Sequence, residues 1–165
     1  MLAQDCGISG RELTWFRMGG FLHDVGKTAV PLEVLNKPGK LTEDEWVAMK
    51  NHTVAGAEIV EQLNFPWSIL PIVRNHHERW NGTGYPDGLA GEEIPYHARI
   101  LCVADVFDAL TTARSYRPAM SRDEAFDIME RDSGVGLDPA LFRRFRALIE
   151  TRAGRAAPAT VPVAA

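Results

Sequence analysis

The chain has 165 residues, enough for one domain with a sizeable core, or for one domain with a tail. Its 45% apolar content is ordinary for a globular protein, and its net charge of −4 excludes a broad basic surface for duplex nucleic acid. The sequence has no signal peptide and no 18-residue apolar run, and its two cysteines, Cys6 and Cys102, form no CxxC pattern. These features favour a cytoplasmic domain that does not enter a membrane.

Three capping-box sequences mark helix starts along the chain. Ser9, Thr42 and Ser121 each stand three residues before a Glu, the spacing at which the two side chains cap each other's backbone amides. Apolar periodicity and the placement of Gly and Pro complete the assignment. The predicted helices are roughly 10–23, 43–62, 66–79, 98–112, 122–131 and 139–151.

The connections between these helices are rich in turn residues. Segment 29–41 could include a short extended or hairpin stretch, and segment 81–98 is a long Gly/Pro-rich loop. No segment alternates at period two, so the fold class is predicted to be all-α, a bundle of about six helices with 98–112 at its centre. The domain should span 1–152, and the Ala/Pro/Val-rich segment 153–165 is predicted to be a disordered tail.

Side chains of metal-ligand type occur in or next to four of the predicted helices, which could bring them together at one site. They are His23, Asp24, His52, His76, His77 and Asp105. Imidazole and carboxylate hold Fe, Mn, Zn or Ni, and burying so many ionisable groups is costly unless something pairs with them. Residues adjacent on a helix diverge by about 100°, so the members of each neighbouring pair should serve two neighbouring ions, or one ion and the side chains around its ligands. The alternative is that His23 and His52 face solvent and Asp105 merely caps a neighbour.

Two adjacent metal ions suit one class of reaction. Paired ions clamp the attacking and leaving oxygens of a displacement at phosphorus, and they lower the pKa of a shared water. Phosphoester hydrolysis needs both effects, so the ligand pattern indicates a phosphohydrolase.

The motifs resemble those of the HD-GYP phosphodiesterases, a subgroup of the HD metal-dependent phosphohydrolases. The matching strings are HDVGK at 23–27, LNKPGKLTEDEW at 35–46, KNHTVAGAEIV at 50–60, HHERWNGTGYPDGLAGEEIP at 76–95, ARILCVADVFDALTTARSYRPAM at 98–120 and EAF at 124–126. The agreement spans about residues 10–148, and the combination of HHE and GYP at this spacing is highly specific.

The resemblance implies an enzyme that hydrolyses the bacterial messenger cyclic di-GMP to pGpG or GMP. It implies two or three divalent metal ions, iron or manganese, held by the six residues named above, with Asp24 as the bridging carboxylate. Lys27 would act on the scissile phosphate or leaving oxygen, where a compact ammonium is apt.

The resemblance also implies a substrate-binding wall. The glycines of the GYP loop, including Gly84, would permit positive φ and a close approach of backbone amides to phosphate. Tyr85 would stack on guanine or donate a hydrogen bond to phosphate. Arg114 and Arg117 match basic family positions that contact the nucleotide phosphates. The corresponding alternatives are an ordered turn with Tyr85 packed down, and solvent-exposed or salt-bridged arginines.

The chain departs from the family pattern at its start. The family has an earlier helix with an acidic residue and a histidine, and no histidine precedes His23 here. The domain therefore reads as truncated relative to the family, as a domain completed by a partner chain, or as an inactive module that binds nucleotide or a protein such as a diguanylate cyclase domain. An apolar face at Leu13, Trp15, Phe16 and Leu22 would then be exposed and favour a homodimer.

Overall fold

The computed structural model describes residues 1–63, 69–113 and 118–156, and these residues are helical with no β-strand, which confirms the all-α prediction. Two isolated bridges, Asn81–Ala90 and Ser133–Leu137, are the β-type pairings among them. The helices are α1 (Leu2–Asp5), α2 (Gly10–Leu22), α3 (Leu32–Leu35), α4 (Glu43–Lys50), α5 (His52–Gln62), α6 (Leu70–Asn75), α7 (Tyr96–Thr111), α8 (Arg122–Asp132) and α9 (Pro139–Ala156), with 3-10 turns η1 (Val25–Ala29) and η2 (Gly91–Glu93).

Two of the three predicted capping boxes form. The Thr42 hydroxyl accepts from the amide of Glu45 while the Glu45 carboxylate accepts from the amide of Thr42, and Ser121 with Glu124 repeats the pattern at α8. Ser9 precedes α2 but makes no side-chain cap. Gly10, the first residue of α2, has a φ of +55° and so lacks the helical backbone conformation. The backbone amides that follow it are therefore not placed to donate to the Ser9 hydroxyl.

Two predicted helices end or break earlier than expected, and in both cases a histidine of metal-ligand type lies at the new helix boundary. The predicted helix 43–62 is interrupted at Asn51, whose ψ of −14° departs from the helical value of about −42°. His52 therefore opens α5 instead of lying inside a longer helix. The predicted helix 66–79 ends at Asn75, and residues 66–68 of that prediction lie outside the described part of the chain.

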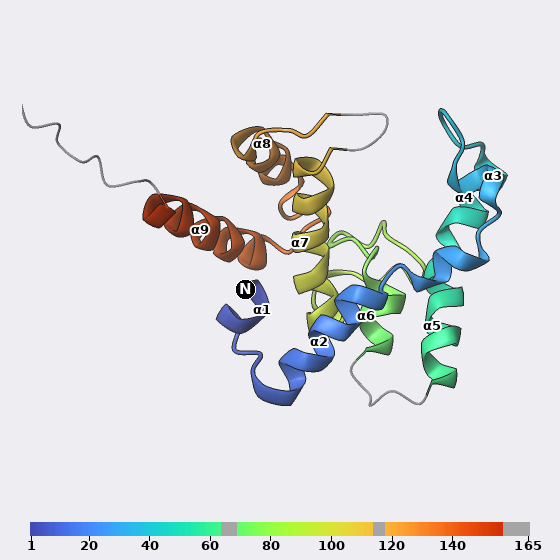
Figure 1. The fold of residues 1–165 in the computed structure, drawn as a ribbon, viewed down its shortest axis with the longest axis horizontal. Coiled ribbons are helices and arrows are strands. Elements are labelled where there is room, and N and C mark those ends of the chain that lie inside the picture. Colours follow the sequence, from blue (N-terminus) through green and yellow to red (C-terminus); the bar gives the residue numbers. More distant parts are fainter. Residues whose placement is uncertain (64–68, 114–117, 157–165) are drawn as a thin grey trace, which may run out of the picture.

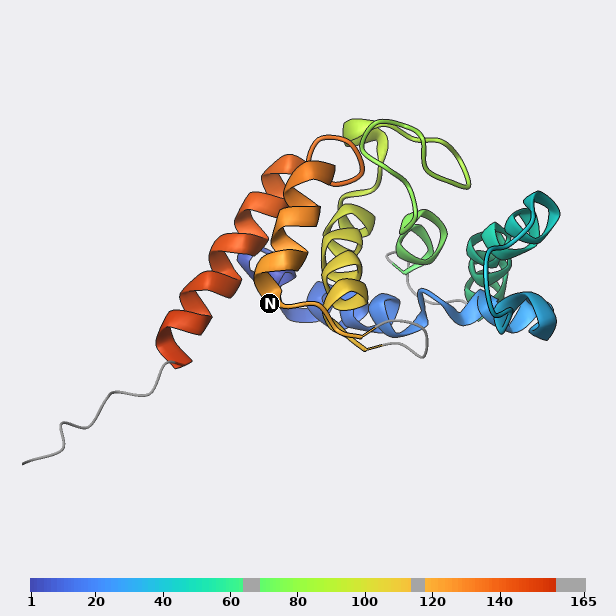
Figure 2. The same ribbon diagram turned by 90° about the horizontal axis from the view of Figure 1, so that it is seen from above.

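Two packed clusters hold the helices together. The larger joins α1, α7, α8 and α9 through side chains that include Ile100, Val103, Phe126 and Phe142. The smaller joins α5 and α6 to α2 through Val60, Ile69 and Val73. Figure 1 shows α7 between the α8–α9 side of the molecule and the side that carries α3, α4 and α5, which agrees with the central position predicted for 98–112. In Figure 2, α2 passes below α7 and α6.

The connecting segments and the chain end differ in detail from the prediction. Segment 29–41 contains α3 and no hairpin, and the long loop ends at Pro95 because α7 begins at Tyr96. Residues 153–156, assigned to the tail from composition, continue α9. Residues 157–165 lie outside the described residues, so the division at residue 152 stays a prediction.

The apolar face predicted on α2 is not exposed. Leu13 and Phe16 pack on the larger cluster, whereas Trp15 and Leu22 pack on the smaller one. The exposed apolar side chain of α2 is Phe21, at 88% exposure. No helix among the described residues is both long enough and apolar enough to cross a membrane.

Candidate metal centre

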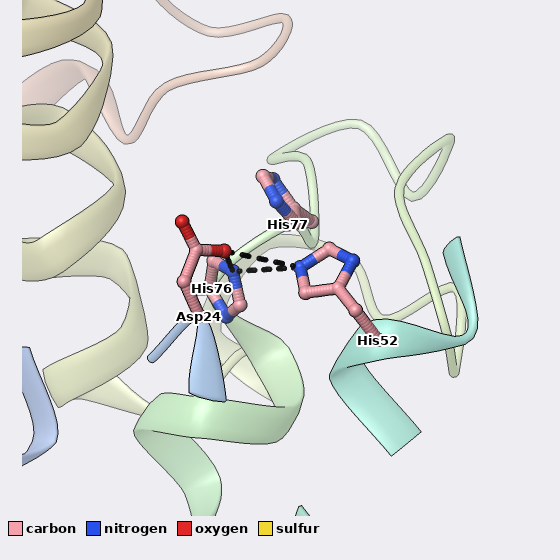
Figure 3. Close-up of side chains that lie close together, drawn as sticks. All are labelled: Asp24, His52, His76 and His77. Atoms are coloured by element: carbon pink, nitrogen blue, oxygen red, sulfur yellow. Dashed lines mark hydrogen bonds and ion pairs between the residues drawn. The ribbon is translucent and has the colours of Figure 1, made fainter. Parts of the chain in front are cut away.

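Four ligand-type side chains converge where several helices begin or end. One ligand atom from each of Asp24, His52, His76 and His77 lies within 4.8 Å of the others. Asp24 follows α2, His52 opens α5, and the two adjacent histidines follow α6. Figure 3 shows these side chains pointing toward one another from three different segments. Helix ends separated in the sequence thus bring the ligands together.

Three imidazoles have their protonation pattern fixed by the backbone. His23 Nδ1 lies 2.7 Å from the carbonyl of Gly20, and His52 and His76 make the same contact, at 2.7 and 2.8 Å, to carbonyls three residues earlier. A carbonyl oxygen only accepts, so each Nδ1 carries the hydrogen and each Nε2 of a neutral ring presents a lone pair. This is the arrangement that orients histidine for metal binding.

The lone pairs of two of these rings face each other. Nε2 of His52 and Nε2 of His76 are 3.4 Å apart, and both rings are almost fully buried. Two buried acceptors at this distance repel unless a cation lies between or beside them. The donor set therefore fits a divalent metal ion on an observation independent of any motif.

The two carboxylate oxygens of Asp24 face different partners. Oδ1 is buried without a hydrogen-bond partner and lies 3.4 Å from Nε2 of His52 and 3.9 Å from Nε2 of His76. Oδ2 lies 3.3 Å from Nε2 of His23 and accepts a 2.6 Å hydrogen bond from Lys27 Nζ. One carboxylate thus contacts two groups of side chains, the geometry that a bridging ligand requires.

Asp105 approaches from α7 on the His23 side. Its Oδ1 lies 3.8 Å from Nε2 of His23, so it joins the second group and not the four-residue cluster. Its side chain is 34% exposed, so Asp105 is not buried, contrary to the burial expected from the sequence for these ionisable groups. The buried positions of α7 lie in its first half, up to Val103, and the second half borders the site.

The predicted divergence of His76 and His77 is also wrong. Their ring centroids are 4.1 Å apart, and both contribute to the same cluster. The reason is that α6 ends at Asn75, so the 100° rotation between neighbours on a helix does not apply to them.

Burial and charge set the protonation of the cluster. Burial lowers the pKa of His76 to about 3 and that of His77 to about 4, so both rings are neutral at pH 7. Burial alone would raise the pKa of Asp24, but hydrogen bonds from His23 and Lys27 outweigh it, and the net pKa is lowered. Burial likewise lowers the pKa of His23, yet the hydrogen bond to Asp24 leaves it raised. Burial also lowers the pKa of His52, so the four-residue cluster is in the deprotonated state that a metal needs.

A close crossing of two glycines places Asp24 next to His52. A Cβ on Gly26 would collide with the backbone carbonyl of His52 and with the backbone of Gly56. A Cβ on Gly56 would in turn lie 2.9 Å from a methyl of Val73. Only glycine lets η1 and α5 approach this closely, so this contact sets the distance across the cluster.

The GYP loop is held by a buried carboxylate that the sequence reading did not single out. Glu78 is 2% exposed and accepts hydrogen bonds from the amides of Asp87, at 2.7 Å, and Leu89, at 3.1 Å. Asp87 also pairs with Arg74 at 2.7 Å. The available signal was the acid that directly follows the histidine pair in the HHE string.

The predicted substrate-wall residues are only partly located. Gly84 packs against the backbone of Glu78 and Arg79, where a Cβ would collide, and it is not among the positive-φ glycines. The Tyr85 ring lies 4.9 Å from the His77 ring, and burial raises its pKa, so its hydroxyl remains a donor. Arg114 and Arg117 lie outside the described residues. Contacts of these four residues with substrate stay predictions.

Comparison with known proteins gives the family. A family model described as "HD domain" matches residues 1–141. The chain belongs to the HD domain family. It is 47% identical over 141 residues to a cyclic di-GMP phosphodiesterase response regulator, RpfG of Xanthomonas campestris, and 40% identical over 142 residues to a 3'3'-cGAMP-specific phosphodiesterase of Vibrio cholerae. These matches confirm the resemblance to HD-GYP phosphodiesterases.

Solved structures agree on the HD fold. A Bdellovibrio bacteriovorus HD-GYP-type protein, Bd1817, aligns with a TM-score of 0.70 at 25% identity over 90% of this chain and 48% of its own. The matches cover 84% and 86% of this HD domain but 37% and 31% of the two curated relatives. The chain thus spans about a third of the length of these relatives.

Proposed function

We propose that this HD domain hydrolyses cyclic di-GMP to pGpG or GMP at a centre of two divalent metal ions, iron or manganese. The observation that carries the proposal is that the two carboxylate oxygens of Asp24 face different histidines. One oxygen faces His52 and His76 at 3.4 and 3.9 Å, and the other faces His23 at 3.3 Å. The relatives named as cyclic dinucleotide phosphodiesterases supply the substrate class.

The proposal assigns each ligand to one of two sites. His52, His76 and His77 would hold one ion, His23 and Asp105 the other, and Asp24 would bridge them. Bound ions would supply Lewis-acid stabilisation of charge at phosphorus and of the attacking and leaving oxygens. The protein's part at the first site is to keep His52 and His76 neutral and oriented, which their lowered pKa values and Nδ1 contacts support.

Other residues would act on the substrate directly. Lys27 Nζ is held 2.6 Å from Asp24 Oδ2, so its positive charge lies beside the place proposed for the scissile phosphate. Tyr85 borders the cluster and would donate its hydroxyl hydrogen to phosphate or contact a base. Arg114 and Arg117 would hold the second phosphate. A diguanylate cyclase domain as partner, and a homodimer, stay predictions.

The test is the substitution Asp24→Asn, which keeps the shape of the side chain and removes its charge. The wild-type chain loaded with Mn²⁺ or Fe²⁺ should hydrolyse cyclic di-GMP, and the variant should lose metal and reduce the rate by about a hundredfold or more. Metal content is measured by elemental analysis, and product by chromatography. Asp123→Asn, at an 84% exposed side chain on α8, is the matched control and should behave as wild type.

Two results would contradict the proposal. Retained hydrolysis by the Asp24→Asn chain would remove the bridging role. A wild-type chain that binds cyclic di-GMP without retaining metal would favour the alternative, a nucleotide-binding module without turnover.

A further inference from the structure

A pocket of about 500 Å³ lies between α4, the start of α5 and the GYP loop. Such a volume is within the range of small-molecule sites. Its lining residues include Asp44, Val47, Ala48, Asn51, Val54 and Tyr85. None of the four-residue metal cluster lines it, so it is a separate hollow.

The helical geometry of α4 explains one wall of this pocket. Positions 44, 47, 48 and 51 are spaced by three and four residues and therefore share one face of the helix. That face carries a carboxylate at one end, two small aliphatic side chains in the middle and an amide at the other end. It offers an apolar floor with polar groups at the rim.

The facing wall is aromatic, and a positive charge from the end of α4 lies next to it. Tyr85 and Pro86 come from the GYP loop, and the ammonium of Lys50 lies 5.6 Å from the centre of the Tyr85 ring. Lys50 also lines the pocket. Flat aromatic and aliphatic surfaces with a few polar groups are what a purine base packs against.

Tyr85 connects the pocket to the metal centre. Its ring lies 4.9 Å from the His77 ring and 6.5 Å from the His52 ring, and it also lines the pocket. A phosphodiester at the cluster would therefore leave the nucleoside attached to it close to the pocket mouth.

We infer that this pocket binds one purine base of the cyclic dinucleotide and that Asp44 selects guanine over adenine; the inference rests on the proposed function. Guanine presents two adjacent N–H donors, at N1 and at the 2-amino group, which a carboxylate can accept together. Its O6 and N7 are acceptors, matched by the ammonium of Lys50 and the amide of Asn51. Adenine places an acceptor, N1, where guanine has a donor, so the same carboxylate would repel it.

The inference addresses a difference among the relatives. One is named for cyclic di-GMP and another for 3'3'-cGAMP, two dinucleotides that differ in one base. The metal centre acts on phosphate and cannot distinguish bases. Discrimination must come from a base site such as this pocket.

The test compares Asp44→Ala with Glu43→Ala. Glu43 is the adjacent acid in the first turn of α4, is exposed and does not line the pocket, so both variants lose the same charge at the same helix end. The probes are cyclic di-GMP as substrate and cyclic di-AMP as competing inhibitor, with the Mn²⁺-loaded full chain. Asp44→Ala should lower kcat/KM for cyclic di-GMP about tenfold or more, because it removes both hydrogen bonds that the carboxylate would accept from guanine. The inhibition constant of cyclic di-AMP should stay equal or improve.

Each other outcome counts against a defined statement. If the wild-type chain turns over cyclic di-GMP and both variants match it, the base pocket is refuted while the proposed function stands. If Asp44→Ala weakens both dinucleotides equally, guanine selection is refuted. If the metal-loaded wild type shows no turnover, the proposed function fails and this inference fails with it.

Discussion

The glycine crossing between η1 and α5 makes the cluster sensitive to a single methyl group. In Gly26→Ala the added Cβ meets the carbonyl oxygen of His52 and the backbone of Gly56. These are backbone atoms, so no side-chain rotation relieves the overlap and the two segments must separate. Overpacking of this kind costs about 1–3 kcal/mol, occasionally more. For a chain of this length that corresponds to a fall in Tm of about 2–4 °C per kcal/mol, or roughly 2–12 °C.

The same displacement should weaken the metal site. His52 opens α5, so separation of α5 from η1 moves its Nε2 away from Asp24 Oδ1, which is 3.4 Å distant in the native chain. Thermal unfolding with and without Mn²⁺ measures both effects. The variant should have a lower Tm without metal, and the increase in Tm on adding Mn²⁺ should shrink or vanish because metal binds the native state less tightly.

Gly20→Ala is the matched control for this experiment. A Cβ on Gly20, within α2, would lie 3.8 Å from a methyl of Leu101, an ordinary contact. Replacing a helical glycine by alanine there should leave stability equal or improve it by up to about 1 kcal/mol. The reasoning is wrong if Gly26→Ala unfolds at the wild-type temperature and keeps the full response to Mn²⁺.

Two further predictions concern the GYP loop and the buried histidines. In Glu78→Gln one of the two loop amides, of Asp87 or Leu89, loses its acceptor, so the free energy of unfolding should fall by about 1–3 kcal/mol and hydrogen exchange at these amides should accelerate. Glu92→Gln, at an exposed residue, is the control. Equal exchange in both variants would exclude this role for Glu78. In the metal-free chain, His76 and His77 bind protons near pH 6.5 when unfolded but only near pH 3 and 4 when folded. The unfolded state therefore binds more protons between these values, so the free energy of unfolding should decrease as the pH falls from about 6.5 to 4. The decrease should be up to about 1.4 kcal/mol per pH unit for each group. The lowered pKa of His52 adds to this trend and the raised pKa of His23 opposes it, so three groups act against one. Urea unfolding at pH 7, 6 and 5 measures the slope, and a flat profile would contradict the burial argument.

The identity of the site was readable from the sequence because rare residue types stand in specific strings. HD at 23–24, HHE at 76–78 and GYP at 84–86 are unusual combinations, and the ligand-type residues in and around them do converge. The helical class was equally readable, because periodicity and capping residues are local signals. Thr42 and Ser121 start α4 and α8 as their spacing predicts.

The geometry of the site was not readable, because it depends on where helices stop. Nothing local in KNHTVAGAEIV indicates that the helix breaks at Asn51, yet this break makes His52 the first residue of α5. Extending α6 to residue 79 placed His76 and His77 on a regular helix and led to the wrong expectation that they diverge. A tertiary contact such as the Gly26–Gly56 crossing leaves no periodic pattern, and a glycine by itself does not reveal which backbone it allows to approach.

The fold and the proposed chemistry are linked by how the histidines are oriented. Each of His23, His52 and His76 donates its Nδ1 hydrogen to the carbonyl three residues before it, in or beside the last turn of the preceding helix. A helix end leaves such carbonyls without an intrahelical partner, so the histidine satisfies the backbone and the backbone fixes the tautomer. The same bond directs each Nε2 toward Asp24. Ligands placed inside helices would lack these carbonyls, which is a physical reason for a helical protein to build a metal site from helix ends.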